Sequence, residues 1–187
     1  MYLYPLKIKD AMRIADLEFE PFIEQAEIEM AIGRIANAVA ADYKDRNPLF
    51  IGVLNGSFRF VAEFIKQYEH PCEVSFVKLS SYQGLTSTGI VETLLDVTDS
   101  VEGRDVVVLE DIIDSGRTLQ ELISLFSGQH VRSFAIATLF FKPSKYKKEY
   151  QINYKGIDLP DEFVVGYGLD YKEKGRELND LYILKTT

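Results

Sequence analysis

The sequence predicts an α/β fold built on a mainly parallel, twisted sheet flanked by helices. Residues 49–54 and 106–109 are short, almost unbroken apolar runs, which is typical of strands covered on both faces. Segments with the three-and-four spacing of an amphipathic helix lie between such runs. Strands that alternate with helices favour parallel pairing, because a helix returns the chain to the start of the next strand.

Length and composition indicate one folded domain spanning residues 1–187. Hydrophobic residues make up 47% and charged residues 27%, which excludes a disordered or collagen-like chain. The single cysteine, Cys72, excludes an internal disulfide and a cysteine-rich zinc site. A formal net charge of -8 disfavours nucleic acid as a partner. Without a long apolar block or a secretory signal, the sequence predicts no membrane partner and a cytoplasmic location.

The first half of the chain predicts two helix-strand alternations and then a loop. The expected elements are a helix over 24–43, a strand over 49–54, a helix over 58–68 and a strand over 73–79. Asn47 and Pro48 end the first helix. Residues 80–89 are rich in Ser, Thr and Gly with few apolar anchors, so we expect a mobile loop there.

The second half begins with the β-branched strand over 106–109, and Glu110 is expected to open a polar loop. A helix follows, with Thr118 and Glu121 as a capping box and Gly128 as its left-handed stop. The remaining expected segments are a strand over 133–141, a basic loop over 142–148, and short strands over 163–167 and 182–184.

The loop after residue 109 carries the strongest chemical signal. Glu110, Asp111 and Asp114 stand at the carboxyl end of a parallel strand, where open α/β sheets bind ligands. Residues 115–118 then lead into a helix N-terminus, whose free N–H groups favour a phosphate. A ligand with a phosphate, sugar hydroxyls and Mg²⁺ would satisfy both halves. The plainer alternative is that Thr118 only caps a helix and the acids only form a solvated turn.

Residues 106–118, Val-Val-Val-Leu-Glu-Asp-Ile-Ile-Asp-Ser-Gly-Arg-Thr, resemble the phosphoribosyl-pyrophosphate signature of type I phosphoribosyltransferases. Within that family the chain is most similar to the branch that acts on hypoxanthine and guanine. Other segments match that branch in the expected order: Leu54-Asn55-Gly56, Ser81-Tyr82, Phe141-Lys142, and residues 163–171 with Arg176. The resemblance covers roughly residue 28 onwards.

The resemblance implies a purine salvage transferase with Mg²⁺ as cofactor and phosphoribosyl pyrophosphate, hypoxanthine and guanine as substrates. The products would be IMP or GMP and pyrophosphate. The fold it implies is the type I phosphoribosyltransferase fold, with a small hood contributed by residues 1–20 and 151–187. A homodimer or homotetramer is also expected.

For phosphoribosyl pyrophosphate, the resemblance implies that Glu110 and Asp111 hold the ribose hydroxyls, directly or through Mg²⁺. Asp114 would also belong to this binding segment and would act as general base on N7 of the purine. The other binding residues it implies are Ser115, Gly116, Arg117 and Thr118 at the 5'-phosphate, and Asn55, Gly56 and Arg176 at the pyrophosphate. The peptide bond before Asn55 would be strained, with a cis bond as one form of that strain.

For the purine, the resemblance implies that Lys142 donates to the 6-oxo group, Phe163 stacks on the base and Val164 makes backbone contacts. Asp170 would lie near the base and a second Mg²⁺, so the implied metal-binding residues are Glu110, Asp111 and Asp170. Ser81 and Tyr82 would belong to a loop that closes over the reaction.

Each assignment has an alternative that the residues alone leave open. Phe163 and Val164 fit a core strand, Lys142 fits a solvated lysine, and Asp170 with Arg176 fits an ordinary surface pair. Asn55 departs from the lysine or arginine often found in the family, which puts a side-chain charge contact in doubt. Arg117 replaces a commoner lysine and changes the donor geometry.

Two other functions also remain open. A non-catalytic sensor could keep the phosphoribosyl-pyrophosphate loop and bind RNA or protein through a basic face, but the net charge of -8 counts against it. A phospho-accepting response-regulator domain would place acids at a strand end, but it leaves the Ser115 to Thr118 segment unexplained.

Overall fold

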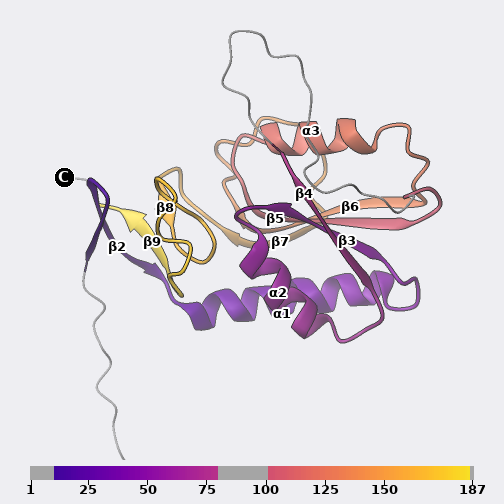
Figure 1. The fold of residues 1–187 in the computed structure, drawn as a ribbon, viewed down its shortest axis with the longest axis horizontal. Coiled ribbons are helices and arrows are strands. Elements are labelled where there is room, and N and C mark those ends of the chain that lie inside the picture. The colour runs from indigo at the N-terminus through magenta and orange to yellow at the C-terminus, as the bar shows by residue number, and fades with distance from the viewer. Residues whose placement is uncertain (1–10, 80–100, 186–187) are drawn as a thin grey trace, which may run out of the picture.

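The computed structural model describes residues 11–79 and 101–185, which form two sheets and three helices (Figure 1). The loop expected at 80–89, with Ser81 and Tyr82, lies outside the described residues. In chain order the elements are β1 (Met12–Ile14), β2 (Leu17–Ile23), α1 (Gln25–Tyr43), β3 (Leu49–Leu54), α2 (Phe58–Tyr68), β4 (Glu73–Lys78), β5 (Asp105–Ile113), α3 (Arg117–Phe126), β6 (Ser133–Phe141), β7 (Tyr154–Asp158), β8 (Val164–Val165) and β9 (Leu181–Leu184).

The larger sheet has five strands in the order β4-β3-β5-β6-β7, and all neighbours pair in parallel. Helices α1 and α2 cover one face and α3 covers the other (Figure 1). All strands therefore end at the same edge of the sheet, and the residues that follow β3, β5 and β6 are brought together there. This arrangement confirms the predicted mainly parallel α/β fold.

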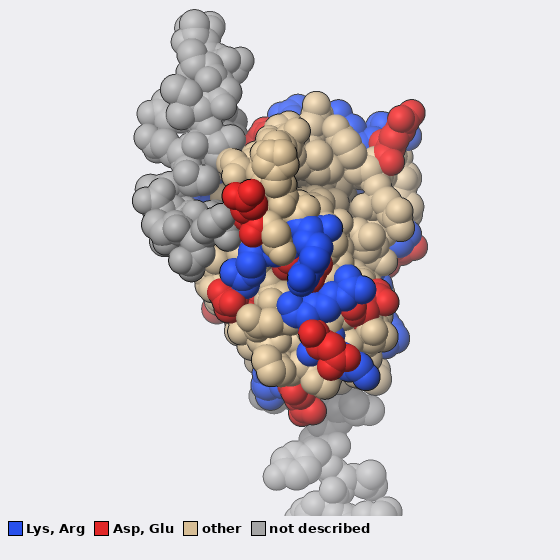
Figure 2. All heavy atoms as spheres, turned by 90° about the vertical axis from the view of Figure 1, so that its right-hand side faces the viewer, with Lys and Arg blue, Asp and Glu red and all other residues tan. Residues whose placement is uncertain are grey.

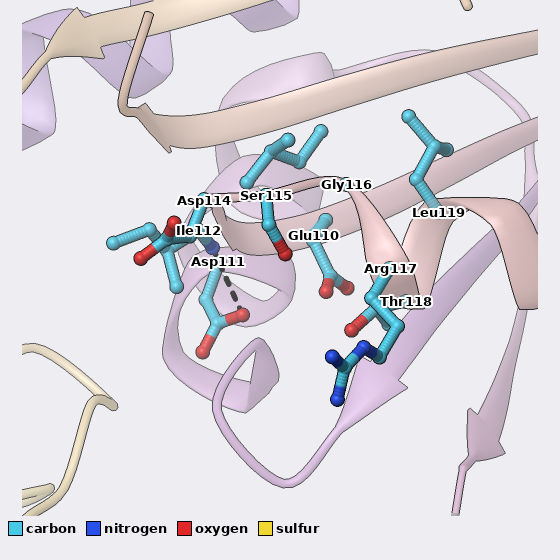
Figure 3. Close-up of a pocket in the computed structure, with 10 residues that line it drawn as sticks. Glu110, Asp111, Ile112, Asp114, Ser115, Gly116, Arg117, Thr118 and Leu119 are labelled. Carbon is cyan, nitrogen blue, oxygen red and sulfur yellow. Dashed lines mark hydrogen bonds between the residues drawn. The ribbon is translucent and has the colours of Figure 1, made fainter. Parts of the chain in front are cut away.

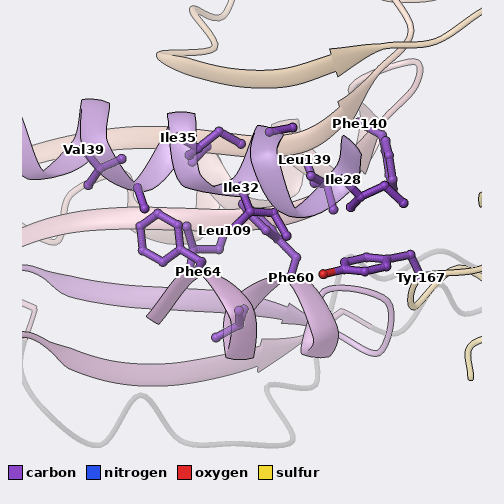
Figure 4. Close-up of a cluster of buried hydrophobic side chains, with 14 of the residues drawn as sticks. Ile28, Ile32, Ile35, Val39, Phe60, Phe64, Leu109, Leu139, Phe140 and Tyr167 are labelled. Carbon is purple, nitrogen blue, oxygen red and sulfur yellow. The ribbon is translucent and has the colours of Figure 1, made fainter. Parts of the chain in front are cut away.

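Alternation along β5 explains why the strand is apolar throughout. Val107 and Leu109 face the cluster under α1 and α2, whereas Val106 and Val108 face the cluster under α3. In the first cluster, the apolar stripe of α1 meets Phe60 and Phe64 of α2 over the sheet (Figure 4). Burial on both faces gives the site at the strand ends a rigid base.

Two predictions around residue 110 are wrong in detail. Strand β5 continues to Ile113, because residues 110–113 keep parallel pairing with β6, with Glu110 opposite Thr138. Helix α3 begins at Arg117 after Gly116, and no side chain caps it. Thr118 is therefore in the first turn and does not form a capping box with Glu121. Gly128 does take the expected left-handed conformation, with φ 85°.

The smaller sheet, which we call the hood, is antiparallel and has the order β1-β2-β9-β8. It lies beyond the carboxyl ends of the parallel strands (Figure 1). The sequence patterns did not indicate β1, β2 or β7. The expected strand over 163–167 is only Val164–Val165, because Gly166 and Tyr167 turn the chain with positive φ. Residues 154–158, expected in the hood, form β7 at the edge of the parallel sheet.

The amino ends of the parallel strands carry a network of mixed charge. Asp105 is buried and accepts hydrogen bonds from Arg132 and from Ser133 Oγ, the latter at 2.6 Å. The Arg132 hydrogen bonds lower the pKa of Asp105 below its usual range. Figure 2 faces this end of the molecule and shows acidic side chains among and around the lysines and arginines. Among the described residues, no helix is long and apolar enough to span a membrane.

Candidate active site

The turn between β5 and α3 lines a cavity of about 290 Å³ at the carboxyl edge of the sheet. Its walls are the ten residues 110–119, so it includes the predicted residues Glu110, Asp111, Asp114, Ser115, Gly116, Arg117 and Thr118. Figure 3 shows Glu110, Arg117 and Thr118 on the same side of the turn, with Leu119 pointing the other way into the core. The predicted anion-binding turn and acidic pair thus share one hollow.

A second cavity of about 210 Å³ extends the first toward β3. Glu110, Asp111, Arg117 and Thr118 line both. The second cavity adds residues from β3 and from the turn after it, together with two others: Val53, Leu54, Gly56, Leu79 and Glu121. The segments expected to bind ribose phosphate and pyrophosphate therefore adjoin, although they are far apart in the sequence.

Gly116 shapes the turn between β5 and α3. Its φ of 81° lies in the left-handed region, which glycine adopts without strain. A Cβ at this position would also lie 2.6 Å from Cε2 of Tyr146 in the basic loop. The basic loop therefore packs directly on the turn, and only glycine fits between them.

Glu110 and Asp111 are both buried, with 6% and 9% of their surfaces exposed. Asp111 Oδ1 accepts a hydrogen bond from the Ile112 N–H at 2.9 Å, but Glu110 Oε2 has no partner among the described residues. Burial raises the pKa of Asp111 to about 6, and burial and then Asp111 raise that of Glu110 well above its ordinary value. The pair is therefore suited to receive hydroxyl donors or a cation.

The carboxylate pair fits a magnesium site completed by ligand oxygens. Among residues 11–79 and 101–185, no cluster of three or more His, Cys, Asp or Glu side chains could hold a metal by itself. Mg²⁺ is commonly held by only one or two carboxylates, with phosphate oxygens and waters filling the other positions. The unpartnered Glu110 Oε2 supplies an oxygen ligand of the right kind.

The turn between β3 and α2 packs against the acidic pair. The peptide bond between Leu54 and Asn55 is cis, the form that the resemblance includes for this turn. A Cβ on Gly56 would overlap the Asp111 carboxylate, so the backbone of this turn directly contacts Asp111. The Asn55 side chain is exposed.

Asp114 lines the same cavity and lies beside two lysines. Its Oδ2 is 3.4 Å from Lys145 Nζ and 3.8 Å from Lys142 Nζ. Lys142 is only 3% exposed and donates to the carbonyl oxygen of Glu162 at 2.8 Å. Burial lowers the pKa of Lys142, and Lys145 lowers it further. Lys142 is therefore a fixed, buried donor rather than one more solvated lysine.

Phe163 presents an open aromatic face, whereas Val164 belongs to the core. Phe163 is 43% exposed and Val164 is 4% exposed. The Phe163 ring lies 5.7 Å from that of Tyr171 and 6.2 Å from that of Phe19. The core-strand alternative thus describes Val164, and Phe163 is free to stack on a ligand.

Asp170 and Arg176 form a pair within the site. Asp170 Oδ1 is 2.6 Å from Arg176 Nη2, and Arg176 Nη1 donates to the Gly168 carbonyl at 2.8 Å. A Cβ on Gly168 would overlap the carbonyl oxygen of Gly56. The Arg176 charge also lowers the pKa of Asp111, opposing the larger effect of burial. The hood loop over 166–176 therefore lies against the β3–α2 turn, beside the acidic pair.

Two contributors were missed by the sequence reasoning. Lys145 is closer to Asp114 than Lys142 is, but nothing in the lysine-rich spacing of residues 142–148 distinguishes it. Gly168 was given no role of its own within the matching segment over 163–171, yet it allows the close approach of two backbones. A glycine flanked by bulky residues in a segment that matches a family was the available signal for Gly168.

Comparison with known proteins gives one consistent family. The model of the phosphoribosyl transferase domain matches residues 22–172. A hypoxanthine-guanine phosphoribosyltransferase of Bacillus subtilis is 42% identical over 164 residues, 87% of this chain and 91% of the relative.

Two solved structures agree with this match. A Bacillus anthracis hypoxanthine-guanine phosphoribosyltransferase has a TM-score of 0.81 at 34% identity, covering 89% of this chain and 98% of that one. A Trypanosoma cruzi hypoxanthine phosphoribosyl transferase, studied for the role of its C-terminal region in oligomeric state and activity, has a TM-score of 0.82 at 33% identity. That match covers 93% of this chain and 95% of the other.

Replacing Asp111 by Asn should stabilise the ligand-free protein at neutral and alkaline pH. The folded protein holds the Asp111 proton up to about pH 6, against an ordinary pKa of 3.8, so this group's contribution to stability is lost as the pH rises through that range. The variant should be more stable near pH 8 by about 3 kcal/mol, and the difference should shrink as the pH falls from about 6 to about 4.

Urea unfolding of wild type and Asp111→Asn at several pH values measures this difference. Glu149→Gln removes an exposed carboxylate and serves as the control for the loss of one acidic side chain. A stability difference between wild type and Asp111→Asn that stays constant or narrows with rising pH would contradict the assignment.

Proposed function

The chain belongs to the phosphoribosyl transferase domain family, and on that premise we propose that it is a transferase of purine salvage. It transfers the phosphoribosyl group of phosphoribosyl pyrophosphate to N9 of hypoxanthine or guanine, forming IMP or GMP and releasing pyrophosphate. The observation that carries this function is the cavity at residues 110–119, where a buried carboxylate pair adjoins an anion-binding turn.

The 5'-phosphate binds at the turn over Ser115, Gly116, Arg117 and Thr118. The turn leads into α3, so the first N–H groups of that helix are free to donate to phosphate oxygens. Arg117 adds a guanidinium that lines both cavities and can donate two parallel hydrogen bonds to a phosphate. The ribose hydroxyls then reach the Glu110 and Asp111 carboxylates, which are receptive to donors.

The pyrophosphate binds between the β3–α2 turn and the hood loop. The backbone N–H groups of Asn55 and Gly56 can donate hydrogen bonds to pyrophosphate oxygens there. Asn55 contributes through its backbone because its side chain carries no charge. Arg176 supplies a cation from the hood side. When bound, Mg²⁺ at Glu110 and Asp111, and a second ion at Asp170, would neutralise charge that develops on the leaving pyrophosphate.

The purine binds between Phe163 and the buried Lys142. Phe163 stacks on the ring through its open face, and Val164 contributes backbone groups at the edge of the base. Lys142 donates to the 6-oxo group, and its position is supported by the hydrogen bond to the Glu162 carbonyl. Asp114 lies 3.8 Å from Lys142, close enough to reach the neighbouring N7 of the same base.

In the reaction, the N9 lone pair forms the bond to C1' of the ribose while the C1'–O bond to pyrophosphate breaks and its electron pair leaves with pyrophosphate. The purine loses its N7 proton to the Asp114 carboxylate. Carboxylates beneath the sugar stabilise the positive charge that develops at C1'. Lys145, paired with Asp114, keeps the carboxylate oriented before the base arrives.

The chain is proposed to act in the cytoplasm as a homodimer or homotetramer. The link between oligomeric state and activity studied in the Trypanosoma cruzi relative supports an assembly of this kind. The retained purine groups Lys142 and Phe163 favour an enzyme over a sensor that only binds nucleotide.

Asp114→Asn should lower kcat by about 10²- to 10⁴-fold, the usual contribution of general-base catalysis. The affinity for phosphoribosyl pyrophosphate should stay within about threefold, because the phosphate and ribose groups do not depend on this carboxylate. Steady-state rates with hypoxanthine and guanine, together with calorimetric binding of phosphoribosyl pyrophosphate and Mg²⁺, measure both. The exposed Asp158 provides the control as Asp158→Asn, and unchanged turnover in Asp114→Asn would remove Asp114 from this role.

Adenine should be a poorer substrate than hypoxanthine by about 10⁴-fold in kcat/KM, because a buried lysine donor faces the 6-amino donor of adenine. Lys142→Met should raise KM for hypoxanthine and narrow this gap, whereas Lys147→Met, at an exposed lysine of the same loop, should change neither. The comparison uses kcat/KM for both bases with each protein. Equal use of adenine and hypoxanthine by wild type would refute both the Lys142 assignment and the 6-oxopurine specificity.

A further inference from the structure

The pyrophosphate subsite is built from two parts that belong to different sheets. The β3–α2 turn with Gly56 follows a strand of the parallel sheet, whereas Asp170 and Arg176 lie in a loop of the hood. Contacts between the β3–α2 turn and the hood loop therefore set the distance between Gly56 and Arg176, which must bind the same ligand. Arg59, near the start of α2, makes several of these contacts.

The guanidinium of Arg59 reaches across to the hood chain. Its Nη1 donates to the carbonyl oxygen of Glu177 at 3.2 Å and to that of Leu178, and its Nη2 donates to Asn179 Oδ1 at 2.8 Å. Its central carbon lies 4.6 Å from the ring centroid of Tyr167. One half-buried side chain thus binds both ends of the loop over 167–179.

The chemistry of this contact requires arginine. A planar guanidinium offers five N–H donors in a fixed fork and stacks on an aromatic face, whereas a lysine ammonium offers a compact point charge. Arg59 donates hydrogen bonds from both of its terminal nitrogens and also stacks on the Tyr167 ring. The cation–π contact is made on a buried tyrosine, where such a contact is stronger than at an exposed ring.

The position of Arg59 connects this contact to the ligand site. Gly168, one residue after Tyr167, packs directly against the carbonyl of Gly56, and its carbonyl accepts a hydrogen bond from Arg176. Arg59 lies three residues after Gly56 on the helix that the turn begins. A movement of the Arg59 contacts would therefore move Arg176 relative to Gly56.

We propose that Arg59 is a positioning residue that holds the Asp170–Arg176 loop against the Gly56 turn and so sets the pyrophosphate subsite. This inference rests on the proposed function for the identity of the ligand. The purine groups depend less on Arg59, because β8 pairs with β9, which pairs with β2. The hood also keeps a separate attachment, since Asp180 Oδ1 accepts a hydrogen bond from the Gln25 N–H at 2.9 Å.

The test compares wild type, Arg59→Lys and Arg59→Gln. For Arg59→Gln, the Kd and KM of phosphoribosyl pyrophosphate with Mg²⁺ should rise by about tenfold, while kcat and the KM for hypoxanthine stay within about threefold. Arg59→Lys should recover part of the affinity, because it keeps the charge and one donor at a time. Calorimetry gives Kd without turnover, and steady-state assays give the kinetic constants.

Arg132→Gln is the matched control, because Arg132 also makes several hydrogen bonds but lies at the opposite end of the sheet. It should lower the thermal stability without changing Kd for phosphoribosyl pyrophosphate. Unchanged Kd in Arg59→Gln, or an equal rise in both substrates' KM and in the Arg132→Gln control, would overturn the inference. If wild type binds phosphoribosyl pyrophosphate but does not turn over hypoxanthine, the proposed function fails, while the Kd comparison still decides the role of Arg59.

Discussion

The burial of two adjacent carboxylates at the end of β5 is the constraint on which the site depends. Neighbouring acids in a poorly solvated position repel each other and favour their neutral forms. The fold keeps them there because β5 pairs with β6 past Glu110 and because its earlier residues are buried on both faces. A rigid sheet thus holds two carboxylates whose charged forms would be more stable in water. A ligand with hydroxyl donors or a cation offsets the free-energy cost of keeping them buried. Such local instability is common where proteins carry function.

Close backbone packing transmits this constraint to the rest of the site. Asp111 contacts Gly56, Gly56 contacts Gly168, and the Gly168 carbonyl binds Arg176. The first two contacts require a glycine at one side, so three segments distant in the sequence approach more closely than side chains would permit. The acidic pair, the pyrophosphate turn and the hood loop therefore form one packed unit rather than three independent loops.

Local sequence patterns predicted most strands of the parallel sheet but not strands β1 and β2 of the antiparallel hood. The runs over 49–54 and 106–109 identified buried strands because both of their faces are apolar, and the spacing along α1 matched its buried stripe. The hood strands β1 and β2 were not predicted because β1 has only three residues and because Pro21 interrupts the alternation of acids and apolar residues with which β2 begins. The capping box at Thr118 was wrong because the helix is capped two residues earlier, at Gly116, through its left-handed backbone conformation, which no side-chain pattern reports. For the site, the motif located the acidic turn, but the burial that distinguishes Lys142 from its neighbours depends on carbonyls some twenty residues away.

The pairing of β2 with β9 also bears on how the protein is made. Strand β2 is synthesised early, whereas its partner β9 emerges only after every strand of the parallel sheet. During that interval its backbone N–H and C=O groups are an open edge that could pair with another chain. Strand β2 carries exposed Glu18, Glu20 and Pro21, and charges and proline are the features that discourage such pairing. The exposed acids and the proline of β2 are therefore expected to disfavour pairing with other chains until β9 is available.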